Sequence, residues 1–285
     1  MRKVFLNGAI AFALVSLLSS CNSDNFESKF DDSPSVRTEK RVKELENELL
    51  SSADGWKMIY FTDDSQLGGF TYLYDFEDNK VTMISDVDPY TGYAWSRNPL
   101  EKRTSHFLVS PIGSTVNLMF NDANYIHLLS DNSIYPNNDL KGEGYKGDFQ
   151  FLYYGTDSEG INFLTPREGV KIKMTKATAE DWTNLKLNKD LMTVLRSKRS
   201  LIVTDNEGAT VYNFRYTAKS RYATVLNDDK TESVNGNGGI GIGFNIDEII
   251  VSPAIEFEDG STISVLKLEN GVFKGEVGEN SIIIL

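Results

Sequence analysis

Apolar positions recur with two different periods along the chain, and the change of period separates predicted helices from predicted strands. Over residues 36–53, Val42, Leu45 and Leu49 fall three or four positions apart, and the opposite side is rich in Lys and Glu. This spacing predicts an amphipathic helix. From residue 56 onward the period becomes two, with Trp56, Met58 and Tyr60 alternating with Lys57, Ile59 and Phe61. Alternation of this kind predicts a β-strand with one buried face.

Further short alternating segments follow, separated by turn residues at intervals of about 8–12 residues, as in an antiparallel meander. The predicted strands are 70–76, 81–84, 105–110, 114–121, 124–130, 147–155, 160–165, 170–175, 200–205, 210–217, 221–226, 239–246, 248–252, 255–258, 262–268, 272–276 and 281–284. A second helix is predicted at 178–197, because Thr178 can cap it and Glu180 and Asp181 suit its first turn.

These elements predict a mainly β fold: an antiparallel meander that forms a sandwich or a partly closed barrel, with two short helices. Residues 70–86 align weakly with 210–228, and 148–166 with 242–253, given a gap. A duplicated meander with two similar halves explains these alignments, and chance similarity between alternating strands explains them nearly as well. The predicted organisation is a segment at 1–20, a flexible tether at 21–35, a helix plus a first β-rich half at 36–198, and a second β-rich half at 199–285.

The N-terminal residues have the layout of a secretory signal. Arg2 and Lys3 form a basic region, Ala9–Leu18 is apolar but too short to span a bilayer, and small residues precede Cys21. Because Cys21 is the single cysteine and closes this stretch, we expect a lipoprotein signal peptide over residues 1–20 and acyl chains, palmitate among them, on Cys21. An ordinary cleaved signal is the alternative. Several acyl chains on one residue anchor a protein stably to a membrane.

The polar, partly acidic residues after Cys21 resemble the tethers of surface lipoproteins, and Asn22 differs from the aspartate of an inner-membrane retention signal. We therefore expect a lipid-anchored protein of the outer membrane, at the cell surface, with the periplasmic face as the alternative. The formal charge is −12. Such an acidic surface repels nucleic acid and anionic headgroups, and suits neutral or cationic ligands. No later segment is apolar enough to span a membrane.

Several residues recur in an order that is similar to a known lipoprotein family. They are Gly55-Trp56, Tyr60, Gly68-Gly69, Phe76, Val81-Thr82-Met83, Phe120-Asn121, Asn124-Tyr125, His127, Ser130-Asp131 and Gly147-Asp148-Phe149-Gln150-Phe151. The chain resembles, over about residues 25–270, the family defined by domain of unknown function 4302 from gut-type Gram-negative bacteria. The resemblance implies lipidation, export and a β-rich body, and it carries no catalytic residues.

The sequence contains no recognisable catalytic or metal-binding motif. It has two histidines, His106 and His127, and no H-E-x-x-H or G-x-S-x-G pattern. His127 is expected on a strand at the edge of the core, hydrogen-bonded to a neighbour. Carboxylate pairs such as Asp148 and Asp157 are too common among 41 acidic residues to indicate a hydrolase. We expect no enzyme activity, no metal and no cofactor.

Two further patterns are open to a chemical interpretation. The loops 131–133, 137–139 and 227–229 could hold calcium through Asn and Asp oxygens, although ordinary surface turns explain these residues as well. The Gly-rich run 235–243 lacks the Lys-Ser/Thr of a phosphate-binding loop. It is interpreted as a flexible loop that leads into a glycine-rich strand.

The loop at residues 86–98 is the strongest candidate for a binding site. Tyr90, Tyr93 and Trp95 lie among turn residues, with Asp86 and Asp88 close by. Aromatic rings in a loop serve either as a lid over the core or as an exposed platform. Stacking rings beside hydrogen-bonding acids suit a neutral sugar.

The sequence therefore predicts a lipid-anchored accessory binding protein without chemistry of its own, with extracellular glycan as the expected ligand. A structural or assembly partner of an outer-membrane complex is the alternative. A hydrolase with a non-standard site is the third hypothesis.

Overall fold

The computed structural model describes residues 32–285. The chain divides into a unit that ends at Arg37 and a second unit, Thr38–Leu285, which holds all the strands described below. The predictions for the signal peptide, for Cys21 and for most of the tether concern residues outside the described part. No helix in that part is long and apolar enough to cross a membrane.

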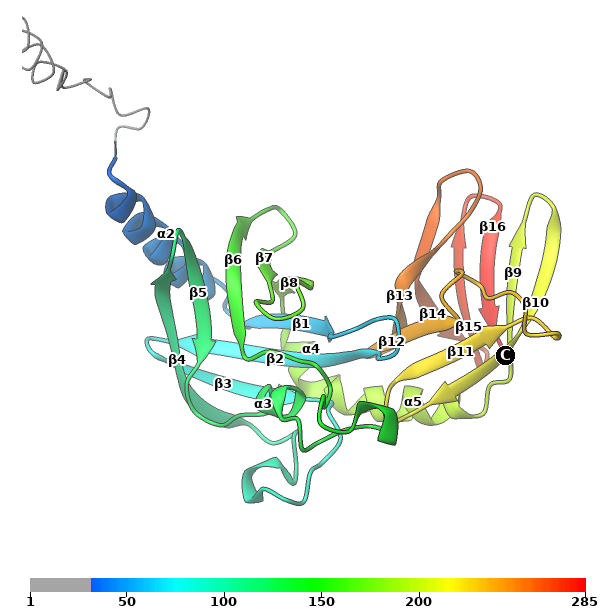
Figure 1. The fold of residues 1–285 in the computed structure, drawn as a ribbon, viewed down its shortest axis with the longest axis horizontal. Helices are drawn as coiled ribbons and strands as arrows, with labels where there is room; N and C mark the ends of the chain where they lie inside the picture. The colour runs from blue at the N-terminus through cyan, green and yellow to red at the C-terminus, as the bar shows by residue number, and fades with distance from the viewer. Residues whose placement is uncertain (1–31) are drawn as a thin grey trace, which may run out of the picture. The chain divides into compact units, whose positions relative to one another are not determined.

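The second unit contains two closed antiparallel barrels, each of eight strands in sequence order (Figure 1). The first barrel consists of β1 (Trp56–Phe61), β2 (Gly69–Glu77), β3 (Lys80–Ser85), β4 (Arg103–Ile112), β5 (Thr115–Phe120), β6 (Gln150–Thr156), β7 (Ile161–Leu164) and β8 (Lys171–Lys176). The second consists of β9 (Ser200–Asp205), β10 (Gly208–Thr217), β11 (Tyr222–Leu226), β12 (Gly239–Asn245), β13 (Glu248–Glu256), β14 (Thr262–Glu269), β15 (Val272–Val277) and β16 (Asn280–Ile284).

The predicted fold class is confirmed: the chain is mainly β, with antiparallel strands closed into barrels and a few short helices. The helical segments are α2 (Pro34–Leu49), η1 (Ala94–Ser96), α3 (His127–Ser130), η2 (Asn138–Leu140), α4 (Ala179–Asn184), η3 (Leu185–Leu187) and α5 (Asn188–Arg196). Of the two weak internal alignments, 70–86 with 210–228 pairs equivalent hairpins, the second and third strands of each barrel. The alignment of 148–166 with 242–253 pairs β6–β7 with β12–β13, which are not equivalent.

The two barrels have cores of different composition. In the first barrel, alternate residues of β1 point inward, and the interior contains stacked rings such as Tyr74 and Phe120, whose centroids are 5.5 Å apart. In the second barrel the interior is mostly aliphatic, with Ile242, Ile249 and Ile282 fully buried. The alternation of inward and outward side chains is the period-two pattern that the sequence shows.

Two local predictions were wrong. Residues 124–130 form a turn and α3 instead of a strand, because Asn124 donates its backbone N–H to His127 Nδ1 at 3.1 Å and Tyr125 N donates to Asn124 Oδ1. The predicted single helix at 178–197 is broken into α4, η3 and α5. Its predicted cap is present, since Thr178 and Asp181 form a capping box at the start of α4.

Candidate functional site

The structure separates the five residues of the predicted aromatic platform into different environments. Asp88 and Tyr93 are exposed, and Tyr90 and Trp95 are half-buried. Asp86 is fully buried, and its carboxylate pairs with Arg221. Asp86 therefore cannot accept a hydrogen bond from a ligand on the surface of this loop, and that part of the predicted platform is corrected.

The three rings of the loop pack on one another. Tyr93 stacks on Trp95 with centroids 5.3 Å apart and planes 7° apart, and Tyr90 meets Tyr93 edge-on at 5.1 Å. The guanidinium of Arg103 lies 5.3 Å from the Trp95 centroid. Tyr90 and Trp95 also pack against the first core. The cluster thus has the packing expected of a lid, and Tyr93 is its one exposed ring.

Tyr93 also connects this loop to a second loop, because its hydroxyl donates a hydrogen bond to Asp131. That bond raises the pKa of Tyr93. Two hollows flank the loop. One of about 370 Å³ includes Asp88 and Tyr90 in its lining, and one of about 470 Å³ includes Trp95 and Arg103.

The glycine-rich run forms part of the contact between the two barrels. In β12, Ile240, Ile242 and Phe244 are buried in the second core, and Gly239, Gly241 and Gly243 alternate with them. A Cβ at Gly241 would lie 2.5 Å from the carbonyl oxygen of Leu67, and one at Gly243 would lie 2.7 Å from Ile59 Cγ2. The glycines on this face of β12 therefore allow the first barrel to approach its backbone closely.

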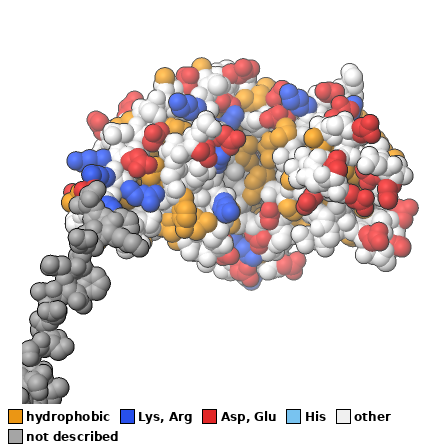
Figure 2. Space-filling model, turned by 90° about the horizontal axis from the view of Figure 1, so that it is seen from above, with side chains coloured by type: hydrophobic (Ala, Val, Ile, Leu, Met, Phe, Trp, Pro, Cys, Tyr) orange, Lys and Arg blue, Asp and Glu red, His pale blue; other side chains and the backbone are white. Residues whose placement is uncertain are grey.

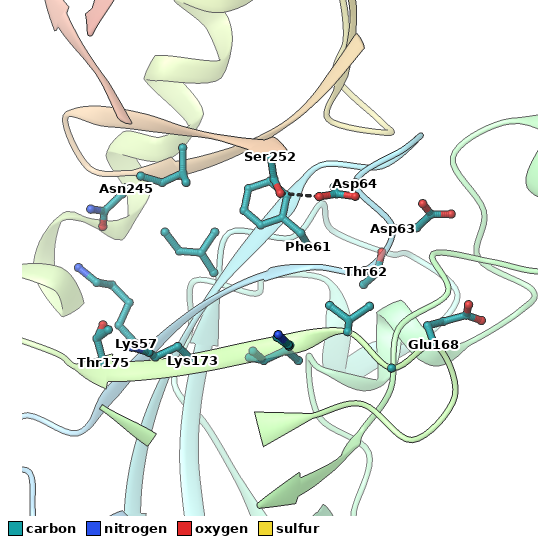
Figure 3. A pocket seen from close by; sticks show the side chains of 16 residues that line it. Lys57, Phe61, Thr62, Asp63, Asp64, Glu168, Lys173, Thr175, Asn245 and Ser252 are labelled. Atoms are coloured by element: carbon teal, nitrogen blue, oxygen red, sulfur yellow. Dashed lines mark hydrogen bonds between the residues drawn. The ribbon is translucent and has the colours of Figure 1, made fainter. Parts of the chain in front are cut away.

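A cleft of about 940 Å³ lies beside this contact, between β1 and β8 of the first barrel and β12 and β13 of the second (Figures 2 and 3). Strand β1 pairs with β2 along its whole length, but it pairs with β8 only over Trp56–Met58. Ile59 and Phe61, which follow, line the cleft together with Lys171–Lys173 of β8. The cleft therefore opens where the ladder between the first and last strands of the barrel stops.

The cleft combines apolar and polar side chains. Its apolar lining includes Phe61, Val170 and Ile250, and Figure 2 shows hydrophobic side chains exposed in this hollow. Figure 3 shows the carboxylates of Asp63, Asp64 and Glu168 at one end, and Lys57, Thr175 and Asn245 at the other. The polar groups thus come from both barrels and flank an apolar centre.

Some of these polar groups are held by neighbours. Ser252 donates a hydrogen bond to Asp64 at 2.6 Å, which ties β13 to the segment after β1, and Lys57 pairs with Asp181 at 2.7 Å. Partial burial by itself raises the pKa of Asp63, but hydrogen bonds from Ser65, Gln66 and Lys146 outweigh it and lower the pKa to about 2.

Two other polar atoms of the lining residues have no partner. Thr62 Oγ1 and Asn245 Oδ1 are buried and accept or donate no hydrogen bond within the described part of the chain. Buried polar atoms are rarely left unsatisfied in folded proteins, so these two are exceptions in the wall of the cleft, and neither has surface that a ligand in the cleft could contact. The polar group that a ligand can reach beside the apolar centre is the exposed carboxylate of Glu168.

The remaining candidates for chemistry lie outside the cleft. His127 stacks on Phe149 at 4.8 Å, and burial lowers the pKa of this histidine. His106 pairs with Asp122 at 2.6 Å on the surface. Among residues 32–285, no group of three or more His, Cys, Asp or Glu side chains is placed to hold a metal ion.

In the three Asn- and Asp-rich loops that were candidates for calcium, the oxygens accept hydrogen bonds within their own turns or from a neighbouring side chain. Asp131 Oδ1 accepts from the backbone and hydroxyl of Ser133, and Asp229 Oδ1 accepts from Thr231. Asn137 Oδ1 accepts from the backbone N–H groups of Asp139 and Leu140 in η2. These bonds explain why Asn and Asp occur in the loops.

Sequence reasoning missed the cleft as a site. Its apolar residues belong to ordinary alternating strands, and only the contact between the barrels brings them together. One signal was present: in the run from Gly239 to Gly243, glycine takes every second position of a predicted strand. Glycine on one face of a strand indicates close approach of another backbone.

A comparison with curated proteins finds no match. A comparison with family models finds one for a domain of unknown function, DUF4302, which matches residues 26–270. That range includes the first barrel and most of the second. The chain therefore belongs to the DUF4302 family.

Proposed function

We propose that this protein is a lipid-anchored, exported binding protein without catalytic chemistry, and that a neutral glycan chain is its ligand. The main observation in support of this proposal is the cleft of about 940 Å³ between the barrels, with its apolar centre and polar ends. Ligand sites are commonly concave, mostly apolar, and located between domains, with a few polar groups that orient the ligand.

The side chains of the cleft suit sugar chemistry. A sugar ring presents an apolar C–H face that can pack on Phe61, which is half-buried at the end of β1. Its hydroxyl groups can donate to the exposed carboxylate of Glu168. Because the whole chain carries a charge of −12, a neutral ligand meets no long-range repulsion.

The carboxylates favour binding over hydrolysis. Glycoside hydrolysis requires one carboxylic acid that keeps its proton near neutral pH. Asp63 has the opposite property, because its pKa is about 2 and its carboxylate is paired with Lys146 at 3.0 Å. Asp64 already accepts a hydrogen bond from Ser252, which uses it to join the barrels.

The place of action follows from the N-terminal sequence. Acyl chains on Cys21 would hold the protein on the outer membrane, at the cell surface, and the segment after Cys21 would space the barrels from the bilayer. An anchored binding protein at that place would concentrate glycan chains near the cell.

The test is a glycan array followed by calorimetry with the full-length protein in detergent. Wild type should bind at least one neutral glycan, and Phe61→Ala and Glu168→Ala should each weaken that binding about tenfold, near 1.4 kcal/mol. Leu108→Ala, at an exposed position of β4, is the matched control and should bind like wild type. Absence of glycan binding, together with capture of one stoichiometric membrane-protein partner, would replace this function by an assembly role.

A further inference from the structure

The first barrel carries an unusually exposed aromatic ring near the cleft. Tyr154 of β6 is 65 % exposed, the highest value among the large hydrophobic residues that are exposed in the described chain. It lies at an irregularity in the pairing of β6 with β7: Tyr153 pairs with Phe163 and Gly155 pairs with Asn162, so Tyr154 is the extra residue. Gly155 has a φ of +120°. A bulge of this type re-aims a side chain, and bulges are frequent beside functional sites.

Tyr154 lines a groove of about 590 Å³ on the outside of the barrel, together with Asn162 and Leu164 of β7. Three residues of β8, Lys171–Lys173, line both this groove and the cleft between the barrels. The two hollows therefore share strand β8 as a common wall.

The register of the strands gives the distance between Tyr154 and strand β8. Asn162 pairs with Lys173 and Leu164 pairs with Lys171, so β7 separates β6 from β8. With neighbouring strands about 5 Å apart, Tyr154 stands about 10 Å from β8. A ligand that reaches from the cleft to Tyr154 must therefore be an extended chain and not a single sugar.

We propose that the groove at Tyr154 is a second subsite for the glycan chain whose other part lies in the cleft between the barrels. This inference rests on the proposed function and adds the length and path of the ligand. One sugar ring stacks on the exposed face of Tyr154, and the chain crosses β8 between Lys171 and Lys173.

The polar groups beside Tyr154 fit a neutral chain. Lys173 is already neutralised by Asp157 and Glu159, so it presents no free charge to a ligand. The amide nitrogen of Asn162 donates to Asp157 at 2.8 Å, which leaves its carbonyl oxygen to accept from a sugar hydroxyl. Among residues 32–285, the Lys171 ammonium has no hydrogen-bond partner and can donate to the chain.

Chain length and a single ring substitution test the subsite. Neutral glucan, mannan and xylan oligosaccharides are titrated into the full-length protein in detergent, each as disaccharide and hexasaccharide. For the series that binds, the hexasaccharide should bind more tightly than the disaccharide. Tyr154→Ala should weaken hexasaccharide binding about tenfold and leave disaccharide binding in the cleft unchanged. Tyr154→Phe keeps the ring and should retain hexasaccharide binding.

The matched control is Tyr93→Ala, which removes the exposed tyrosine ring of the aromatic loop and should leave both affinities unchanged. If wild type binds hexasaccharide and Tyr154→Ala binds it equally well, the subsite is wrong and the proposed function stands. If Phe61→Ala and Tyr154→Ala both match wild type, the chain binds elsewhere and the path from the cleft to Tyr154 is wrong. If no oligosaccharide binds wild type, the proposed function and the subsite fail together.

Discussion

Arg221 and Asp86 form an ion pair across the contact between the two barrels, with 2.8 Å between Nη1 and Oδ1 and no exposed surface on either side chain. Asp86 follows β3, and Arg221 ends the turn between β10 and β11. Arg221 also donates to the carbonyl oxygen of Gly69 at 2.9 Å, and its guanidinium lies 4.2 Å from the Phe70 centroid. Asn188 at the start of α5 donates to the other oxygen of Asp86 at 2.8 Å. One buried network thus joins both barrels and the helix between them.

Removal of Asp86 should strongly destabilise the protein. In Asp86→Ala the guanidinium of Arg221 stays buried without a counter-charge, and the loss of one partner of a buried pair costs about 3–5 kcal/mol. Urea unfolding followed by circular dichroism measures the change. Asp122→Ala, which breaks the exposed pair with His106, is the matched control and should unfold like wild type. Equal stability of Asp86→Ala and wild type would contradict the role of the network.

A methyl group at Gly241 should weaken the contact between the barrels. On a strand, Gly→Ala usually stabilises by about 0.4–1 kcal/mol through the unfolded chain. Here the added carbon would lie 2.5 Å from a backbone oxygen of Leu67, which cannot turn away as a flexible side chain can. We expect a net loss of about 2 kcal/mol for Gly241→Ala. Thermal unfolding measures it, with Val211→Ala at an exposed site of β10 as control. An increase in Tm would show that the close approach is absent.

Asp63 should make stability depend on pH in the acid range. Its folded-state pKa of about 2 lies below the ordinary value of 3.8. The stabilisation is therefore complete above about pH 4 and disappears as the pH falls towards 2, and it amounts to no more than about 2 kcal/mol. Asp63→Asn should be less stable than wild type at pH 6 and equal to it near pH 2.

Two further variants test whether Asp63 and its charge cause the pH dependence of stability. Lys146→Met removes the cation that pairs with Asp63 and should reduce the same pH dependence. Asp88→Asn removes one exposed negative charge and controls for the change of net charge. A constant difference in unfolding free energy between wild type and Asp63→Asn at all pH values would disprove the assignment.

The aromatic loop should act as a lid. Because Trp95 is half-buried and packs on the first core, Trp95→Ala should cost about 2 kcal/mol of stability and leave glycan affinity in the cleft unchanged. Thermal unfolding measures the loss of stability, and titration calorimetry at a temperature where the variant is folded measures glycan affinity separately. Loss of glycan binding with full stability would instead identify the loop as the platform.

The lipid anchor has a direct test. In cells that make Cys21→Ala, the protein should move from the membrane fraction to the soluble fraction, because no acyl chain can be attached. Protease treatment of intact cells should cleave the wild-type protein if it faces outward. A membrane-bound Cys21→Ala protein would rule out lipidation at this residue, and a protected wild-type protein would place it on the periplasmic face.

The alternation of side chains determined the strands and the fold class. Residues such as Trp56, Met58 and Tyr60 point inward because successive side chains of a strand face opposite sides, a rule that needs no knowledge of distant residues. Local signals also located the α4 cap at Thr178, since a capping box involves neighbours only three positions apart.

The tertiary structure alone decided the closure of the meander into two barrels and the position of the candidate site. The charge of Asp86 suggested a ligand contact in the sequence, but Arg221, 135 positions away, makes it a buried structural group. Phe61 and Ile250 gave no signal of a cleft, because their side chains are ordinary outward residues of separate strands. Local periodicity thus specifies each strand and the face it buries, whereas long-range packing determines which outward faces meet and where they leave space for a ligand.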